Sequence, residues 1–209
     1  MKGLILKDFY TSIKELRSYF VILALFIAVS FISEGMYFFA IYPCLICGMF
    51  PQSLMSFDER SKWENYCGTL PINKSDVVSS KYIFTMILIL ITTGVSAVAQ
   101  AVRLFITETY TGNTYMFTVL SIFVLSCITV AIQLPFVFKY GAEKGRIGYY
   151  VMVIVASFGS VLSGNLLNEN HEIEQSNGMI WIVLCVVAIA FYALSCLLSI
   201  RFYNKREIH

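Results

Sequence analysis

The 209-residue chain is too apolar for a water-soluble protein. Hydrophobic residues make up 58% of it and charged residues 13%, whereas a soluble domain has roughly 25% charged residues. The formal net charge is only +2, but the 15 basic and 13 acidic residues are unevenly spread along the chain. One helix across the bilayer needs about 20 apolar residues, so a chain of this length accommodates six spans joined by short loops.

The opening segment predicts a helix that lies on the membrane surface. Ile5, Phe9, Ile13 and Leu16 recur at helical spacing, and the charged residues of the segment mostly lie off this stripe. We therefore expect an amphipathic interfacial helix over residues 1–18, flat on the inner leaflet, that turns into the first span. A cleaved signal peptide is the alternative, but the segment before the first apolar run is long for a simple basic leader and contains acidic residues.

Six apolar runs follow one another, separated by charged and turn-forming residues. We expect transmembrane helices at residues 19–33, 36–57, 82–105, 116–138, 147–166 and 179–200. The sequence thus predicts an all-α integral membrane protein with a single transmembrane domain over residues 1–209. The six cysteines lie in these runs or in a loop expected in the cytosol, so no disulfide framework is indicated.

The basic residues set the expected orientation of these spans. All but one of the 15 Lys and Arg residues lie in four segments, namely 1–18, 58–81, 139–146 and 201–209. These segments are alternate loops and both termini, and the positive-inside rule places them in the cytosol. We expect a multi-pass protein of the cell membrane with both termini cytoplasmic.

The predicted spans lack the groups that ion-driven carriers and intramembrane enzymes use. They contain no Asp, His or Lys, and Arg103 near the outer end of the third span is either an interfacial anchor or part of a path. Cys44 and Cys47 form a C-x-x-C pair in an apolar run, where small apolar residues are expected more often than redox or metal ligands. The chain has no Gly-Lys-Ser/Thr phosphate loop either. We predict that it is not an enzyme and that, if it transports a substrate, the energy comes from another subunit.

Polar residues form stripes on two predicted spans. Thr92, Ser96, Gln100 and Arg103 fall on one face of the third span, and Gln133 ends a shorter stripe on the fourth. Such stripes avoid lipid, so they either hold helices together or line a watered translocation path. The sequence leaves both interpretations open.

The fifth span carries small residues at steps of four, namely Ala156, Ser160 and Gly164. This small-xxx-small pattern lets two helices approach closely, within one chain or between two chains. We favour packing across a dimer, because six short spans leave little room to enclose a peptide-sized path.

The longest cytosolic loop predicts a second short amphipathic helix. Asp58 and Glu59 suit its first turn, Trp63 and Tyr66 lie on one face, and the Gly and Pro of residues 68–71 end it. This helix either rests on lipid headgroups or docks in a groove of a soluble partner. In the second case the expected contact residues are Asp58, Glu59, Arg60, Trp63, Glu64 and Tyr66.

Three motifs of the chain resemble those of the small ABC-2 type permeases of Gram-positive bacteria. They are the opening M-K-G-L-I-L-K-D, the loop D-E-x(3)-W-E-x-Y-x(2)-T-L-P-I-x-K, and S-K-Y at the start of the third span. The resemblance covers the whole chain in layout. It implies that the loop after the second span is a coupling helix for a separate ATPase, which binds ATP and Mg²⁺, and that two permeases pair with two ATPases. It also implies a second, weaker ATPase contact at residues 139–146, for which an ordinary positive-inside loop is the alternative.

These observations predict the permease subunit of an ATP-binding cassette exporter. One similar subfamily exports amphipathic peptides, the phenol-soluble modulins, and the resemblance implies such peptides or similar hydrophobic cargo. The expected partners are a cytosolic ATPase, a second permease copy in a homo- or heterodimer, and membrane lipid, but not nucleic acid. No cofactor is expected on this chain, and its expected location is the plasma membrane of a Gram-positive bacterium. A stand-alone channel, carrier or scaffold without an ATPase is the alternative.

Overall fold

The computed structural model describes residues 2–32, 38–67, 69, 73–106, 112–151, 154 and 178–205, and every regular element in these ranges is a helix. The helices are α1 (Lys2–Ile32), α2 (Phe38–Arg60), α3 (Trp63–Cys67), α4 (Lys74–Ile106), α5 (Gly112–Tyr140) and α7 (Gly178–Lys205), with a further helix at 142–151. The all-α prediction is thus confirmed for the part of the chain that the structure describes.

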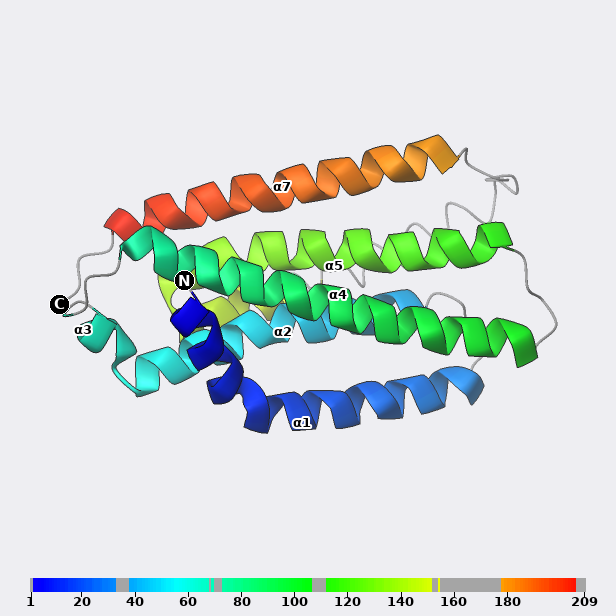
Figure 1. Cartoon of the computed structure of the whole chain (residues 1–209), viewed down its shortest axis with the longest axis horizontal. Helices are drawn as coiled ribbons and strands as arrows, with labels where there is room; N and C mark the ends of the chain where they lie inside the picture. Colours follow the sequence, from blue (N-terminus) through cyan, green and yellow to red (C-terminus); the bar gives the residue numbers. More distant parts are fainter. Residues whose placement is uncertain are drawn as a thin grey trace.

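The long helices lie side by side in one bundle (Figure 1). α5 packs against α2, α4 and α7, whereas α1 packs on the other side of the bundle against α2 and α4. The beginnings of α1 and α4, the short α3 and the last turn of α7 all lie at the same end of the molecule (Figure 1). We call this end the basic end, because most of the basic residues of the described ranges lie in the segments that meet there.

Three helices within the described ranges are long and apolar enough to cross a membrane. They cover Lys74–Arg103, Thr118–Tyr140 and Val183–Tyr203, with mean hydropathies of 2.1, 2.2 and 2.6. These helices correspond to the third, fourth and sixth spans of the sequence analysis. The fifth span falls mostly outside the described residues, so the total of six spans stays a prediction.

The predicted interfacial helix and the first span form one continuous helix, α1. Figure 1 shows that α1 is bent, so that its first turns cross the basic end while the rest runs along the bundle. Thr11 Oγ1 donates to the carbonyl of Lys7 at 2.9 Å, and Ser12 Oγ donates to the carbonyl of Asp8. Hydroxyl groups that bond to the preceding turn in this way often bend helices.

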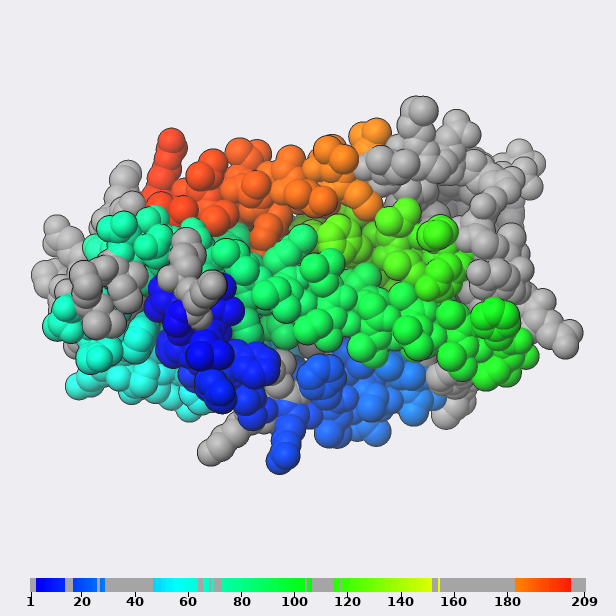
Figure 2. Space-filling model, in the orientation of Figure 1, coloured from blue at the N-terminus to red at the C-terminus, as the bar shows by residue number. Residues whose placement is uncertain are grey.

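The first turns of α1 have two different faces. Leu4, Asp8 and Ser12 are buried against the bundle, whereas Phe9 and Ile13 of the predicted apolar stripe are exposed. Figure 2 shows these first turns lying on the outside of the bundle, between α2 and α4. Ile5 of the same stripe is half-buried against the bundle, so only part of the stripe is exposed, and its contact with lipid stays a prediction.

The core is densest around α5. Cys127, Val130, Leu134 and Val137 of this helix are fully buried in one apolar cluster with residues of α2, α4 and α7. The helix at 142–151 folds back onto α2, where Gly48 leaves no room for a side chain, since a Cβ there would meet Tyr149 Cε2 at 2.6 Å. This close packing holds the residues that follow α5 at the basic end in place.

Candidate functional site

Four charged side chains form a cluster at the basic end, which we call the charge cluster. Lys7 and Asp8 come from α1, Asp58 from the last turn of α2 and Lys81 from α4. Lys81 Nζ lies 2.5 Å from Asp58 Oδ2 and 3.3 Å from Asp8 Oδ1. Lys7 Nζ pairs with Asp58 Oδ1 and lies 3.3 Å from Asp8 Oδ1. Two bases and two acids thus give the charge cluster a formal charge of zero.

The charge cluster is withdrawn from solvent. Asp8, Asp58 and Lys81 are only 2%, 4% and 3% exposed, and Lys7 is partly buried. Burial of an ion is costly, so each of these charges depends on the others for compensation. The charge cluster therefore fixes the first turns of α1 to α2 and α4 across large separations in sequence.

The short loop helix differs from its prediction. Asp58 and Glu59 do not begin it but lie in the last turn of α2, which runs on to Arg60. The sequence interpretation was wrong here because α2 extends beyond the apolar run, with the Asp58 carboxylate neutralised by two lysines. Asp58 is consequently buried, so the structure does not favour a direct contact between Asp58 and a docked partner.

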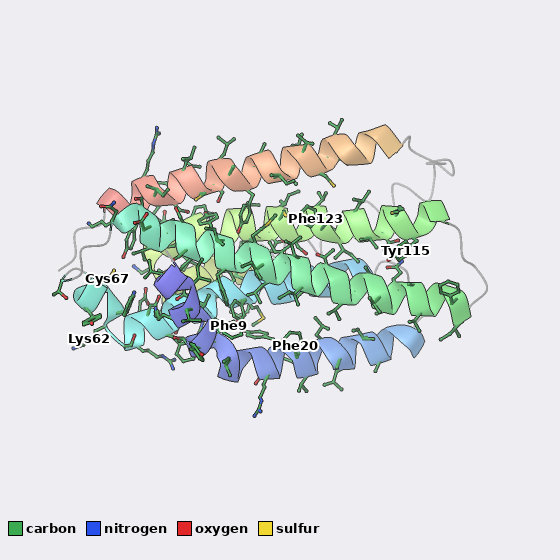
Figure 3. The ribbon with its side chains drawn as sticks, in the orientation of Figure 1. Phe9, Phe20, Lys62, Cys67, Tyr115 and Phe123 are labelled. Atoms are coloured by element: carbon green, nitrogen blue, oxygen red, sulfur yellow. The ribbon has the colours of Figure 1, made fainter. Side chains whose placement is uncertain are left out.

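A left-handed residue separates α2 from α3. Lys62 has φ 53°, and Ser61 and Lys62 close the turn by bonding to the carbonyls of Phe57 and Glu59, at 2.9 and 3.2 Å. Left-handed backbone is unfavourable for a residue with a Cβ, so the turn is held by its surroundings. Figure 3 shows Lys62, which precedes α3, and Cys67, the last residue of α3, at the end of the bundle.

The aromatic pair predicted for the loop is present on α3. The rings of Trp63 and Tyr66 lie 5.5 Å apart between centroids, and Tyr66 is 59% exposed. Lys7 Nζ lies 4.2 Å from the centroid of the Trp63 ring, a cation–π contact. Arg60 is exposed on the neighbouring turn. Of the predicted contact residues, only the side chain of Glu64 lies outside the described residues.

Glu59 joins the two predicted cytosolic loops. Its Oε1 accepts a hydrogen bond of 3.0 Å from the backbone N–H of Ala142, the first residue of the helix at 142–151. Gly141, with φ 84°, turns the chain between α5 and this helix. A carboxylate at a helix N-terminus satisfies a free N–H and interacts favourably with the helix dipole. The loops at 58–74 and 139–146, which sequence reasoning treated as separate contacts, therefore share one surface.

The polar stripe of α4 faces the inside of the bundle. Thr92, Ser96 and Gln100 are buried, and the hydroxyls of Thr92 and Ser96 donate to carbonyls of their own helix. Thr92 Oγ1 also lies 3.2 Å from the thiol of Cys47 on α2, which Ser126 of α5 contacts as well. The stripes of α4 and α5 thus meet at this thiol and are hydrogen-bonded there.

Two glutamines of the predicted path do not meet. Gln100 lies near the end of α4 far from the basic end, where its buried Oε1 has no hydrogen-bond partner among the residues that the structure describes. Gln133 lies toward the basic end of α5, and its Nε2 donates to the carbonyl of Gly145 at 3.3 Å. Arg103 is half-buried one turn beyond Gln100. The structure therefore places the buried Gln133 against the helix at 142–151 and not beside Gln100.

Two further features from the sequence analysis are the small-residue pattern of the fifth span and the grouping of metal-ligating side chains. Ala156, Ser160 and Gly164 lie outside the described residues, so their packing stays a prediction. Among the residues that the structure does describe, no three His, Cys, Asp or Glu side chains are grouped as a metal site.

Sequence reasoning did not assign Lys7, Asp8 and Lys81 to the site. A signal was present, because Asp8 lies one turn from Leu4 and off the apolar stripe, and Lys81 directly borders an apolar run. Opposite charges at such positions have to be compensated when the helices pack. The three motifs that carried the resemblance in fact meet at the charge cluster.

The family model described as "ABC-2 family transporter protein" matches residues 3–204 of the chain. The chain belongs to this family. A search of the curated proteins found no match. As an ABC-2 permease, the protein is a membrane component of an ABC transporter. Permeases of this family generally work with an ATPase subunit and often dimerise.

Proposed function

We propose that this ABC-2 permease exports amphipathic peptides or similar hydrophobic cargo, driven by a separate ATPase that docks at the basic end. The observation that carries the proposal is the exposed Tyr66, whose ring contacts that of Trp63 in a short helix at the end of the bundle. Aromatic and Arg side chains dominate the energy of protein interfaces, and Arg60 lies exposed beside this pair. ATP and Mg²⁺ bind to the partner, and hydrolysis of this ATP supplies the energy for export.

The docking surface in this proposal is formed by α3 together with the turn at 139–146. Glu59 supports it by connecting the end of α2 to Ala142. Lys139 and Lys144 are exposed there, so a partner with acidic residues around an apolar groove fits the surface best. In the proposal both termini are cytoplasmic, the membrane is the plasma membrane of a Gram-positive bacterium, and two copies of the permease act together.

The proposed cargo path follows the stripe of α4. Thr92 and Ser96 are bonded within their own helix, whereas the buried carbonyl oxygen of Gln100 accepts no hydrogen bond from the described part of the chain. An unpaired buried acceptor is costly, so a cargo donor that reached it would be bound favourably. Apolar and hydroxyl walls suit one apolar and one polar face of a helical peptide and offer no set of oxygen ligands for a metal cation.

Docking is tested by co-purification of the tagged permease from its native membranes in mild detergent. We expect an ATPase with Walker motifs to be retained, and Trp63→Ala or Tyr66→Ala to release it, at a cost of about 2 kcal/mol or more. Tyr150→Ala is the matched control, because Tyr150 is also exposed but lies on another helix. Retention of the ATPase by both α3 variants excludes the docking role, and the absence of any ATPase favours a stand-alone channel, carrier or scaffold.

The cargo class is tested with the purified complex in proteoliposomes. ATP hydrolysis is measured while amphipathic peptides, lipids and small hydrophobic drugs are added in turn. We expect stimulation by peptides that weakens in Gln100→Leu and persists in Thr93→Val, which removes a buried hydroxyl of the same helix outside the stripe. Stimulation by drugs alone, with Gln100→Leu silent, contradicts a peptide path along α4.

A further inference from the structure

Lys7 connects two parts of the basic end, namely the end of α2 and the short helix α3. Its Nζ donates to Asp58 Oδ1 at the end of α2, 51 positions along the chain. The same nitrogen lies 4.2 Å from the centroid of the Trp63 ring in α3. One ammonium group thus fastens both the end of α2 and the face of α3 to the first turns of α1.

The position of α3 depends on such side-chain contacts. This helix has five residues, which is too short for a stable helix on its own, and α2 is the helix against which its backbone packs. Cys67 anchors its last turn in the apolar cluster that also contains Leu4 of α1. Trp63, in the first turn of α3, is only partly buried against that cluster. The contact of its ring with Lys7 is therefore a second attachment of α3, in addition to Cys67.

The charge cluster carries this attachment into the membrane helices. Asp58 is shared by Lys7 and Lys81, and Lys81 also holds Asp8. Separation of any one of these groups would leave a buried charge without its partner, which is strongly unfavourable. The four groups therefore favour moving as a unit, and Lys7 is the member that also contacts α3.

We propose that Lys7 is a positioning residue that holds α3 in its docked orientation and links it, through the charge cluster, to α1 and α4. When an ATPase displaces α3, the displacement is passed to the beginnings of these two long helices. The first step of this inference, the dependence of α3 on Lys7, is a property of the permease alone. The second step, transmission of a displacement of α3 to α1 and α4, rests on the proposed function.

The first step is tested on the purified permease in detergent without an ATPase. The chain has two Trp residues, so Trp181→Phe makes Trp63 the only tryptophan, and quenching of its fluorescence by acrylamide reports its exposure. Loss of an ordinary cation–π contact corresponds to a roughly fivefold rise in the population of detached α3. We expect stronger quenching in Lys7→Ala, recovery in Lys7→Arg, which restores the cation, and no change in Arg17→Ala, which removes an exposed cation of α1 elsewhere. Equal quenching in Lys7→Ala and the parent overturns the inference.

The second step is tested with the co-purified complex in proteoliposomes. The probe is a dye-labelled amphipathic peptide built from Leu and Lys, and both its transport and ATP hydrolysis are measured. We expect Lys7→Ala to lower the amount of peptide moved per ATP several-fold while hydrolysis persists, and Lys7→Arg to restore the ratio. An unchanged ratio overturns the transmission step. If no ATPase co-purifies, the proposed function and this step fail together, while the quenching experiment still decides the first step.

Discussion

Glu59 Oε1 accepts a hydrogen bond of 3.0 Å from the backbone N–H of Ala142, which ties the end of α2 to the helix at 142–151. Two loops that are far apart in sequence thereby form one surface at the basic end of the bundle. Because the contact uses a backbone N–H, it depends on the acid at position 59 and not on the side chain at 142.

We expect Glu59→Ala to lower the thermal stability of the permease. The change leaves the N-terminus of the helix at 142–151 without its acceptor, and loss of a helix cap costs about 1 kcal/mol. Glu59→Gln keeps an acceptor without the charge, so we expect a smaller loss. The measurement is the unfolding temperature in one detergent, with Arg60→Ala as the control because Arg60 is an exposed neighbour. Equal losses in Arg60→Ala and Glu59→Ala would show that the cap is unimportant.

Gly48 is expected to tolerate no side chain. In Gly48→Ala the new Cβ would meet Tyr149 Cε2 at 2.6 Å and Thr129 Cγ2 at 3.0 Å. Overpacking of this kind costs about 1–3 kcal/mol, so the unfolding temperature should fall.

The matched control for this change is Gly94→Ala on α4. Nothing lies within 4 Å of a Cβ at position 94, and Ala is favoured over Gly in a helix by about 1 kcal/mol. We therefore expect Gly94→Ala to keep or raise the unfolding temperature. A fall of similar size in both variants would indicate that helix flexibility, and not the contact with Tyr149, explains the result.

The turn before α3 is expected to reject β-branched residues. Lys62 has φ 53°, which an L residue adopts at a cost of about 1–2 kcal/mol and a β-branched residue adopts least readily. Lys62→Val should therefore weaken binding of the ATPase by displacing α3, whereas Lys62→Gly and Lys62→Asn should retain it. All three variants remove the same exposed charge, so the comparison separates backbone conformation from charge. Equal binding by the Val and Gly variants would contradict this explanation.

The sequence predicts the helices well because hydropathy and helical periodicity are local properties. The spans at 82–105, 116–138 and 179–200 fall within α4, α5 and α7, each of which extends further at both ends. The helix boundaries at the basic end were harder to predict, because a charged residue next to an apolar run is typical of a loop. Asp58 and Lys81 lie within helices because each is the counterion of the other. The burial of a charged residue in a helix can be predicted only when its partner of opposite charge is known.

The site could be predicted in part for the same reason. Trp63 and Tyr66 lie three residues apart, so their shared face follows from helix geometry. Their contact with Lys7 and the contact of Glu59 with Ala142 follow from tertiary packing, which no local pattern specifies. Thr92, Ser96 and Gln100 are buried, as helical spacing predicts for a polar face that avoids lipid, but their role in a path stays a prediction. Gln133, from the separate stripe of the fourth span, is bonded to Gly145 by a tertiary contact that no local pattern specifies.

Removal of Lys81 is expected to have the largest effect of these changes. Lys81→Met leaves Asp8 and Asp58 with one lysine between them, and loss of one partner from a buried ion pair costs about 3–5 kcal/mol. We expect a low yield of monodisperse permease and a marked fall in its unfolding temperature. Lys81→Arg should be milder, since it keeps the charge.

The charge balance can be restored without the lysine. Lys81→Met combined with Asp8→Asn leaves Lys7 paired with Asp58 and no net charge in the cluster. If compensation of buried charge is what Lys81 supplies, the double variant should be more stable than Lys81→Met alone, although Asp8→Asn by itself should be destabilising. Interaction energies of contacting residues are measured by such a double-mutant cycle. Additive losses in the cycle would mean that Lys81 acts by packing its side chain, and not by neutralising the two aspartates.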